Sequence, residues 1–185
     1  SPFETSDVRP QVSGVIVARP FVEGANVRAG QVLYQIDPAP YRAAYDEATA
    51  QLTSAKANVV TTQLKAQRYA ALVKINGVAK QDYDDAEAAY KQAAAQVLQL
   101  RAAADAARIN LAYASVRAPI SGRVGISTVT KGALVTASQT TALTTIQRLN
   151  PIYVDVTQSA DELLRLRRAM ASGKLTGGPS SVPVR

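Results

Sequence analysis

The stretch that decides the fold is VRPQVSGVIV, residues 8–17, because the chain repeats it as VRAPISGRVG at residues 116–125. The copies lie 108 residues apart, and further residues keep the same register: Val8 with Val116, Arg9 with Arg117, Val12 with Ile120, Ser13-Gly14 with Ser121-Gly122, Gly24-Ala25 with Gly132-Ala133, Val27 with Val135 and Ala29 with Ala137. After a shift of two residues, Leu33 and Ile36 align with Leu143 and Ile146. Because glycines as well as valines keep the register, we interpret the copies as two homologous halves of one small β-sandwich.

Between the two copies lies an alanine-rich stretch with a heptad pattern. The residues that recur at alternating steps of four and three are Tyr41, Tyr45, Ala48, Leu52, Ala55, Val59, Thr62, Ala66, Tyr69 and Val73, then Tyr83, Ala86, Tyr90, Ala93, Val97, Leu100, Ala104, Ala107 and Leu111. KINGVAK (74–80) interrupts the pattern with Asn-Gly, a strong turn signal. Two heptad runs joined by a short turn predict an antiparallel two-helix coiled coil, with a rod on the order of 50 Å long.

The composition argues against an enzyme. The 185 residues include no cysteine and no histidine, which excludes disulfides, cysteine-based zinc sites and the commonest general base. Asp82, Asp84 and Asp85 cluster after the turn, but acidic residues in the first turn of a helix are explained by the helix dipole. We therefore predict no catalytic residue, no cofactor and no metal site.

The net charge of +7 raises the question of a nucleic-acid or membrane-surface partner. No basic run is longer than the one in LRR (166–168), and no aromatic residues interleave with the basic ones to stack on bases. We therefore predict no nucleic-acid partner. The chain also lacks a run of about 20 apolar residues, the length needed to span a bilayer.

The C-terminal part differs from both the sandwich and the hairpin. IYVDV (152–156) alternates like a strand, and Ser159 with Glu162 forms a capping-box pattern that opens a helix through Ala171. One strand and one helix cannot cover their own apolar faces. We therefore predict that this end, together with the N-terminal residues, is an incomplete third domain.

A sandwich of two equivalent halves split by a helical hairpin resembles the periplasmic adaptor (membrane fusion) proteins of tripartite RND drug efflux pumps. The strings that carry the resemblance are VRPQVSG, EGANVRAGQVLYQIDPAPY, ARINLAYASVRAPISGR, KGALVTASQ and LNPIYVDVTQS. The resemblance implies an elongated α+β multidomain fold: an antiparallel coiled-coil hairpin inserted between two halves of a lipoyl-like β-sandwich, plus an incomplete β-barrel segment with one short helix. The implied domains are 8–37 and 113–147 for the lipoyl-like halves, 38–112 for the hairpin with its tip at 73–80, and 1–7 with 148–185 for the partial barrel.

The resemblance implies a structural adaptor that bridges an inner-membrane RND transporter and a TolC-like outer-membrane channel. Such adaptors pack side by side, so we also expect self-association. We expect a periplasmic location, with anchoring to the inner membrane through an N-terminal segment that this sequence does not include.

Two other hypotheses compete with the RND adaptor. An adaptor of a type I secretion or ABC-type efflux system stays open, although the arm length and NPIYVDVTQS favour the RND branch. A lipoyl or biotinyl carrier domain needs a lysine on the turn between its halves. No lysine occurs between Asp37 and Ala55, and the only methionine is Met170, which argues strongly against a carrier.

By resemblance, the hairpin tip docks onto the channel through an Arg, a Leu four residues later and a Ser seven residues beyond that. Arg68 and Leu72 match, but the third position is Ala79. Alanine cannot cap the next helix with a side-chain oxygen, a loss of about 0.5–2 kcal/mol relative to a good cap. Either another residue starts that helix, or docking relies on Arg68, Leu72 and backbone groups. The predicted docking residues are Arg68, Leu72, Val73, Lys74, Ile75, Asn76, Gly77, Val78 and Ala79.

Overall fold

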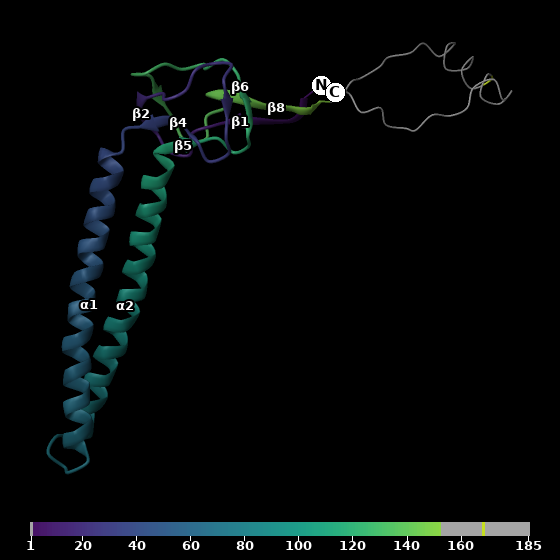
Figure 1. Ribbon diagram of the computed structural model, residues 1–185. Coiled ribbons are helices and arrows are strands. Elements are labelled where there is room, and N and C mark those ends of the chain that lie inside the picture. Colours follow the sequence, from purple (N-terminus) through teal and green to yellow (C-terminus); the bar gives the residue numbers. More distant parts are fainter. Residues whose placement is uncertain (1, 153–167, 169–185) are drawn as a thin grey trace.

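The computed structural model describes residues 2–152 and residue 168. In these residues the chain forms a small β-sandwich, from which two long helices project as a rod (Figure 1). None of the described helices combines the length and the apolar character that crossing a membrane requires. The helix predicted from Ser159 to Ala171 and the rest of the third domain beyond residue 152 lie outside the described residues.

The strands form two antiparallel sheets of four strands each, in the orders β1-β8-β6-β3 and β5-β4-β2-β7. Their bounds are β1 Pro2–Val8, β2 Gly14–Ala18, β3 Asn26–Val27, β4 Val32–Ile36, β5 Ser115–Arg117, β6 Gly122–Val124, β7 Leu134–Val135 and β8 Thr144–Ile152. The repeat relates β5 to β1, β4 to β8, β2 to β6 and β7 to β3, so the two orders are equivalent. Each sheet therefore takes two strands from each half of the repeat.

Hydrogen bonds between the halves explain why Ser-Gly is repeated. The backbone N–H of Ala29 donates to Ser121 Oγ at 2.8 Å, and the N–H of Ala137 donates to Ser13 Oγ at 2.9 Å. Backbone hydrogen bonds between the two halves show the same equivalence. Gly24 N donates to the Val124 carbonyl at 2.9 Å, and Gly132 N donates to the Ile16 carbonyl at 2.8 Å. The two halves are thus equivalent in structure, as the sequence repeat predicts.

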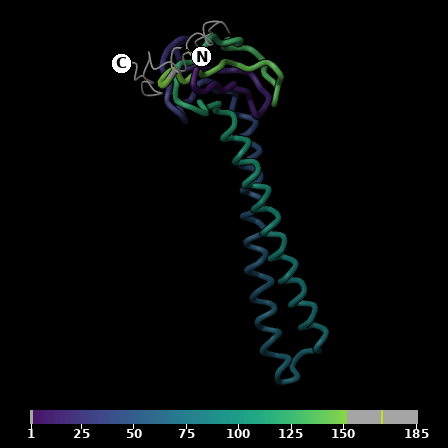
Figure 2. Tube along the Cα trace, turned by 90° about the vertical axis from the view of Figure 1, so that its right-hand side faces the viewer, coloured from purple at the N-terminus to yellow at the C-terminus, as the bar shows by residue number. Residues whose placement is uncertain are grey.

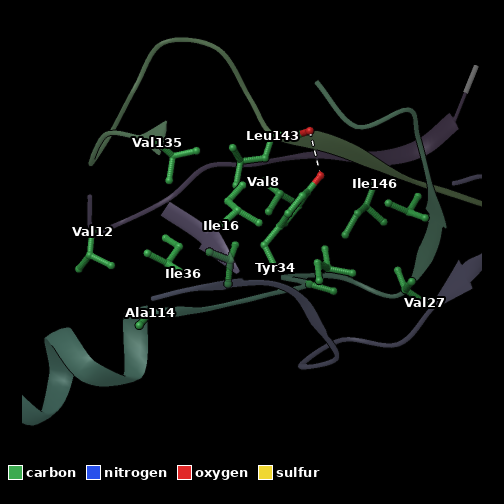
Figure 3. Close-up of a cluster of buried hydrophobic side chains, with 14 residues drawn as sticks. Val8, Val12, Ile16, Val27, Tyr34, Ile36, Ala114, Val135, Leu143 and Ile146 are labelled. Carbon is green, nitrogen blue, oxygen red and sulfur yellow. Dashed lines mark hydrogen bonds between the residues drawn. The ribbon is translucent and has the colours of Figure 1, made fainter. Parts of the chain in front are cut away.

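The core lies between the two sheets, where side chains of both halves meet (Figure 3). Leu33, Ile36, Leu143 and Ile146 are all fully buried, and burying such a side chain is worth about 2 kcal/mol. Tyr34 is the largest buried side chain. Its hydroxyl donates to the Leu143 carbonyl at 3.0 Å and lies 2.6 Å from Ser127 Oγ. Burial raises the pKa of the Tyr34 hydroxyl.

The hairpin consists of α1, Ala39–Val73, and α2, Lys80–Tyr113. Every residue of the predicted seam is buried or half-buried, so the heptad prediction is confirmed. The buried residues of the two helices are alanines that let the two backbones approach closely: Ala55, Ala66, Ala86, Ala93 and Ala104. At 1.5 Å per residue, each helix spans about 50 Å, and the rod extends far from the sandwich (Figure 2).

The base of the hairpin is fixed to the sandwich by neighbouring strands. α1 follows β4, α2 leads into β5, and Gln35 of β4 pairs with Ser115 of β5. The Ser115 hydroxyl donates to Gln35 Oε1 at 2.8 Å, and the Tyr41 hydroxyl donates to the Ser13 carbonyl at 2.5 Å. The hairpin therefore stands where a tight turn would ordinarily connect two adjacent antiparallel strands.

Candidate functional site at the hairpin tip

The candidate site is the turn at residues 74–79, which joins the two helices at the end of the rod away from the sandwich (Figure 2). Asn76 has a left-handed backbone, with φ of 55°. Its N–H donates to the Val73 carbonyl at 3.2 Å, and the N–H of Gly77 donates to the Leu72 carbonyl at 2.9 Å. This pair of bonds is the Schellman pattern that satisfies the last carbonyls of a helix. Asn-Gly thus ends α1 as a defined turn.

The start of α2 has no side-chain cap. Ala79 has the extended backbone of an N-cap residue, with ψ of 147°, and no side-chain oxygen satisfies the N–H groups of the first turn. The sequence left open that a residue other than Ala79 starts this helix. In the structure Ala79 itself occupies the N-cap position, immediately before α2. Asp82 in the first turn interacts favourably with the helix dipole.

The tip exposes apolar side chains next to a cation. Ile75 is 74% exposed and Leu72 is 37% exposed. Arg68 lies one turn before Leu72 on the same side of α1, and its Nε donates to the Leu64 carbonyl at 3.3 Å. Val73 and Val78 are half-buried and close the turn, whereas Lys74, Asn76, Gly77 and Ala79 are exposed. An exposed apolar surface beside a guanidinium suits contact with another protein.

The predicted set of tip residues did not include Leu64. This side chain is 53% exposed and lines a shallow hollow with Gln67, Arg68 and Ala71. The sequence did carry a signal for Leu64, because it is a leucine at a heptad position that faces away from the seam, where an apolar side chain is exposed. Within the described residues no cluster of acidic side chains could hold a metal ion.

Replacing Ala79 by Ser should stabilise the protein by about 1 kcal/mol, because a serine hydroxyl at this extended position can accept an N–H of the first turn. The measurement is the shift of the urea unfolding midpoint. The matched control is Ala89→Ser, the same change at an exposed position inside α2, which should lower stability by roughly 0.5 kcal/mol. Equal losses in both variants would show that residue 79 is not a site for capping.

Comparisons with known proteins agree with this architecture. Residues 4–147 match the family model described as RND MFP, barrel-sandwich hybrid domain. The chain is 55% identical over 173 residues to multidrug resistance protein MexA of Pseudomonas aeruginosa, covering 94% of this chain and 42% of MexA. It is 51% identical over 173 residues to multidrug export protein AcrE of Escherichia coli, covering 94% of this chain and 45% of AcrE. The chain thus spans less than half the length of these curated relatives.

Two solved structures share the fold. A MacA–MexA chimera with the Pseudomonas aeruginosa MexA α-hairpin is 40% identical, with a TM-score of 0.51, and the match covers 80% of this chain and 49% of the chimera. ZneB from Cupriavidus metallidurans is 28% identical, with a TM-score of 0.57, and the match covers 80% of this chain and 62% of ZneB. From the family match over most of its length and from these identities, the chain belongs to the RND membrane fusion proteins, a family of non-enzymatic adaptors.

Proposed function

We propose that this chain is the hairpin-bearing part of the adaptor subunit of a tripartite drug efflux pump. The adaptor bridges an inner-membrane RND transporter and a TolC-like outer-membrane channel in the periplasm, and it is anchored through a segment outside this sequence. The observation that carries the proposal is a rod of about 50 Å whose base is fixed to the sandwich and whose exposed tip is apolar and cationic. Relatives that are named multidrug export and resistance proteins support it.

The proposed docking surface for the channel comprises Arg68, Leu72 and residues 73–79. Leu72 and Ile75 supply apolar contact area, and Arg68 offers a cation to a carboxylate or to helix-end carbonyls of the channel. The free N–H groups at the start of α2, after Ala79, are further donors to an acceptor on the channel. Docking without the family serine therefore relies on Arg68, Leu72 and backbone groups.

We also propose that copies of the adaptor pack side by side through the backs of their helices, the faces turned away from the seam. The back positions on α1 are Ala43, Ala50, Ala57, Leu64 and Ala71, and those on α2 are Ala88, Ala95, Ala102 and Ile109, all of them exposed. At equal distances from the tip, Leu64 stands level with Ala88, and Ile109 stands level with Ala43. A large side chain on one back thus meets an alanine on the other, which favours head-to-tail contact in a closed ring.

The test of the bridging function uses a single cysteine at the tip, since the described residues contain none. A Gly77→Cys variant of the full-length protein, with any other reactive cysteine replaced, should be captured by a short crosslinker on an outer-membrane channel in cells. A Cβ at Gly77 would lie 3.4 Å from the nearest atoms, both of Leu72, so the change is accommodated by a small shift. The control is Gln63→Cys in the middle of α1.

Capture at residue 77 and not at residue 63 is the expected result. Absence of capture at residue 77, in cells that express and export the protein, would contradict docking through the tip. Capture of a channel that serves a type I secretion or ABC-type system would instead favour the alternative transport class.

A further inference from the structure

Opposite charges collect on the two sides of the turn at the end of the hairpin. In residues 48–81 every charged residue is basic, and these are Lys56, Lys65, Arg68, Lys74 and Lys80. In residues 82–90 every charged residue is acidic, and these are Asp82, Asp84, Asp85 and Glu87. The far end of α1 is thus cationic, and the first turns of α2 after Lys80 are anionic.

These charges do not neutralise each other within one chain. In the part of the hairpin that the structure describes, no ion pair joins α1 to α2, and Glu87 pairs with Lys91 of its own helix at 2.9 Å. The helix dipole accounts for Asp82 in the first turn of α2, but its effect falls off within that turn. It therefore does not explain Asp85, which lies beyond the first turn, or Arg68, which precedes the last turn of α1.

Arg68 and Asp85 stand at the same height on the rod and on the same side of it. Arg68 lies eight residues before Asn76 and Asp85 nine residues after it, so their heights differ by about 1.5 Å. A hollow between the helices is lined by Ser54, two heptads before Arg68, and by Gln96, three turns after Asp85. Both charged side chains are exposed next to the backs of their helices, on the side where this hollow opens. Within one hairpin the seam separates them.

Side-by-side packing brings the two residues together from different copies. In a closed ring every copy stands at the same height, and the back of α1 in one copy meets the back of α2 in the next. Arg68 of one copy then lies level with Asp85 of the neighbouring copy, beside the contact between Leu64 and Ala88. The cationic end of α1 thus meets the anionic start of α2, and this charge complementarity identifies the occupant of the surface as a second copy of the chain.

Packing about a two-fold axis along the rod would bring like charges together instead. The back of α1 would then face the back of another α1, with Arg68 beside Arg68, or α2 would face α2, with Asp85 beside Asp85. Such contacts are destabilising. Head-to-tail packing does place Asp46 level with Asp105 near the sandwich, but Arg108 already pairs with Asp105 at 3.4 Å. The charges near the tip therefore favour the head-to-tail ring over a two-fold dimer.

We infer that Asp85 of each copy holds Arg68 of the next, so that every channel-docking surface is completed by a neighbouring copy. This inference rests on the proposed function and its side-by-side packing. A carboxylate occupies only part of a guanidinium, which has five N–H donors, so Arg68 keeps donors for the channel. Asp85 is then a positioning residue, because it fixes the cation that contacts the channel. Docking should accordingly be stronger for assembled copies than for single ones.

Crosslinking between the helix backs tests the register. Leu64→Cys and Ala88→Cys are introduced together into the full-length protein, with any other reactive cysteine replaced; the described residues contain none. We call this variant the cysteine pair. In cells, a short bismaleimide should join it into a ladder of dimers, trimers and larger species, because each copy contacts two neighbours. The matched control, Leu64→Cys with Ala95→Cys, is displaced by one heptad, about 10 Å, and should give little product.

Two results of this experiment would overturn the inference. The first is absence of the ladder from the cysteine pair. The second is a dimer formed by Leu64→Cys alone, because that product requires two α1 helices to meet back to back. Crosslinking at Gly77→Cys separates the two proposals. Capture of the channel without a ladder leaves the bridging function standing, whereas lost capture contradicts the bridging function itself.

Charge reversal in the cysteine pair tests the ion pair. With the outer membrane permeabilised at low ionic strength, Asp85→Arg or Arg68→Asp should lower the ladder yield about fivefold, and added salt should reduce the difference. The two changes together exchange the charges and should restore the ladder. Asp84→Arg is the matched control, since Asp84 lies on the other side of the back of α2, level with Gln67, and it should leave the yield unchanged. An undiminished ladder in Asp85→Arg, or no recovery on exchange, would overturn the pair.

Capture of the channel through Gly77→Cys tests the positioning role. Capture should fall in Asp85→Asn and be retained in Asp85→Glu, which keeps the carboxylate. The exchanged variant, Arg68→Asp with Asp85→Arg, should restore the ladder but not capture, because the cation then sits on α2. If capture returned together with the ladder, Asp85 would serve assembly alone and would not position the docking cation.

Discussion

Removing two heptads from each arm of the hairpin, residues 52–65 and 88–101, should abolish drug export while leaving the protein folded. The deletion removes residues that lie opposite each other at equal distances from the tip, so the seam continues in register. It shortens the rod by about 20 Å at 1.5 Å per residue and keeps Arg68, Leu72 and the whole turn. The tip chemistry is thus intact, but it no longer reaches the channel. The measurement is dye efflux from cells, with helical content checked by circular dichroism.

The matched control restores the length with two heptads per arm copied from elsewhere in the hairpin, and it should recover export. If the shortened protein exported normally, the distance between transporter and channel would not be set by the hairpin, and the bridging proposal would fail. Loss of export in the control as well would point instead to a specific surface within residues 52–65 or 88–101.

Gly122→Ala should destabilise the sandwich by about 3 kcal/mol, at the upper end for overpacking. A Cβ at Gly122 would lie 2.4 Å from the Gln147 carbonyl oxygen and 2.8 Å from its carbon. Both atoms belong to the backbone of β8, so the new methyl group is accommodated only by separating β6 from β8. The measurement is the urea midpoint of the purified protein, with an unchanged slope of the transition.

The internal repeat supplies the control for this substitution. Gly30 has φ of 82°, and its equivalent in the second half is Ser138, with φ of 54°. No atom lies within 4 Å of a Cβ built at Gly30. Gly30→Ser should therefore cost only about 1 kcal/mol, the price of a left-handed residue. Equal losses at positions 30 and 122 would mean that contact with β8 adds nothing to the cost at Gly122, and would contradict the steric argument.

Much of this fold could be predicted from the sequence because the two halves can be compared with each other, residue by residue. The residues that keep register across the repeat include those that exchange hydrogen bonds, Ser13 with Ala137 and Ser121 with Ala29. What the repeat alone did not predict is that each sheet mixes strands of both halves. Strand pairing depends on which strand edges lie next to each other in the folded protein. Two similar half-sequences could form one sheet each, or could each contribute strands to both sheets.

The hairpin was predictable for a different reason. A heptad pattern fixes the helical phase, so the seam could be listed residue by residue and is confirmed by burial. The tip was harder. Asn-Gly predicted a turn, but whether Ala79 precedes α2 depends on backbone angles that a residue type with no capping side chain does not determine.

The sharing of strands between halves has a consequence for the order in which the chain folds. Residues 8–37 include β2 and β4, which pair with each other, but β3 lacks its partner until β6, near residue 122, is present. Gln35 and Ser115 are 80 residues apart, and closing a flexible loop of that length costs conformational entropy. Formation of the helical hairpin would reduce this cost, because α1 and α2 can pair locally through the short turn and so bring both ends of the loop together. We therefore expect the hairpin to form before the sandwich closes, so substitutions that loosen its alanine seam should slow formation of the sandwich although no core residue of the sandwich is changed.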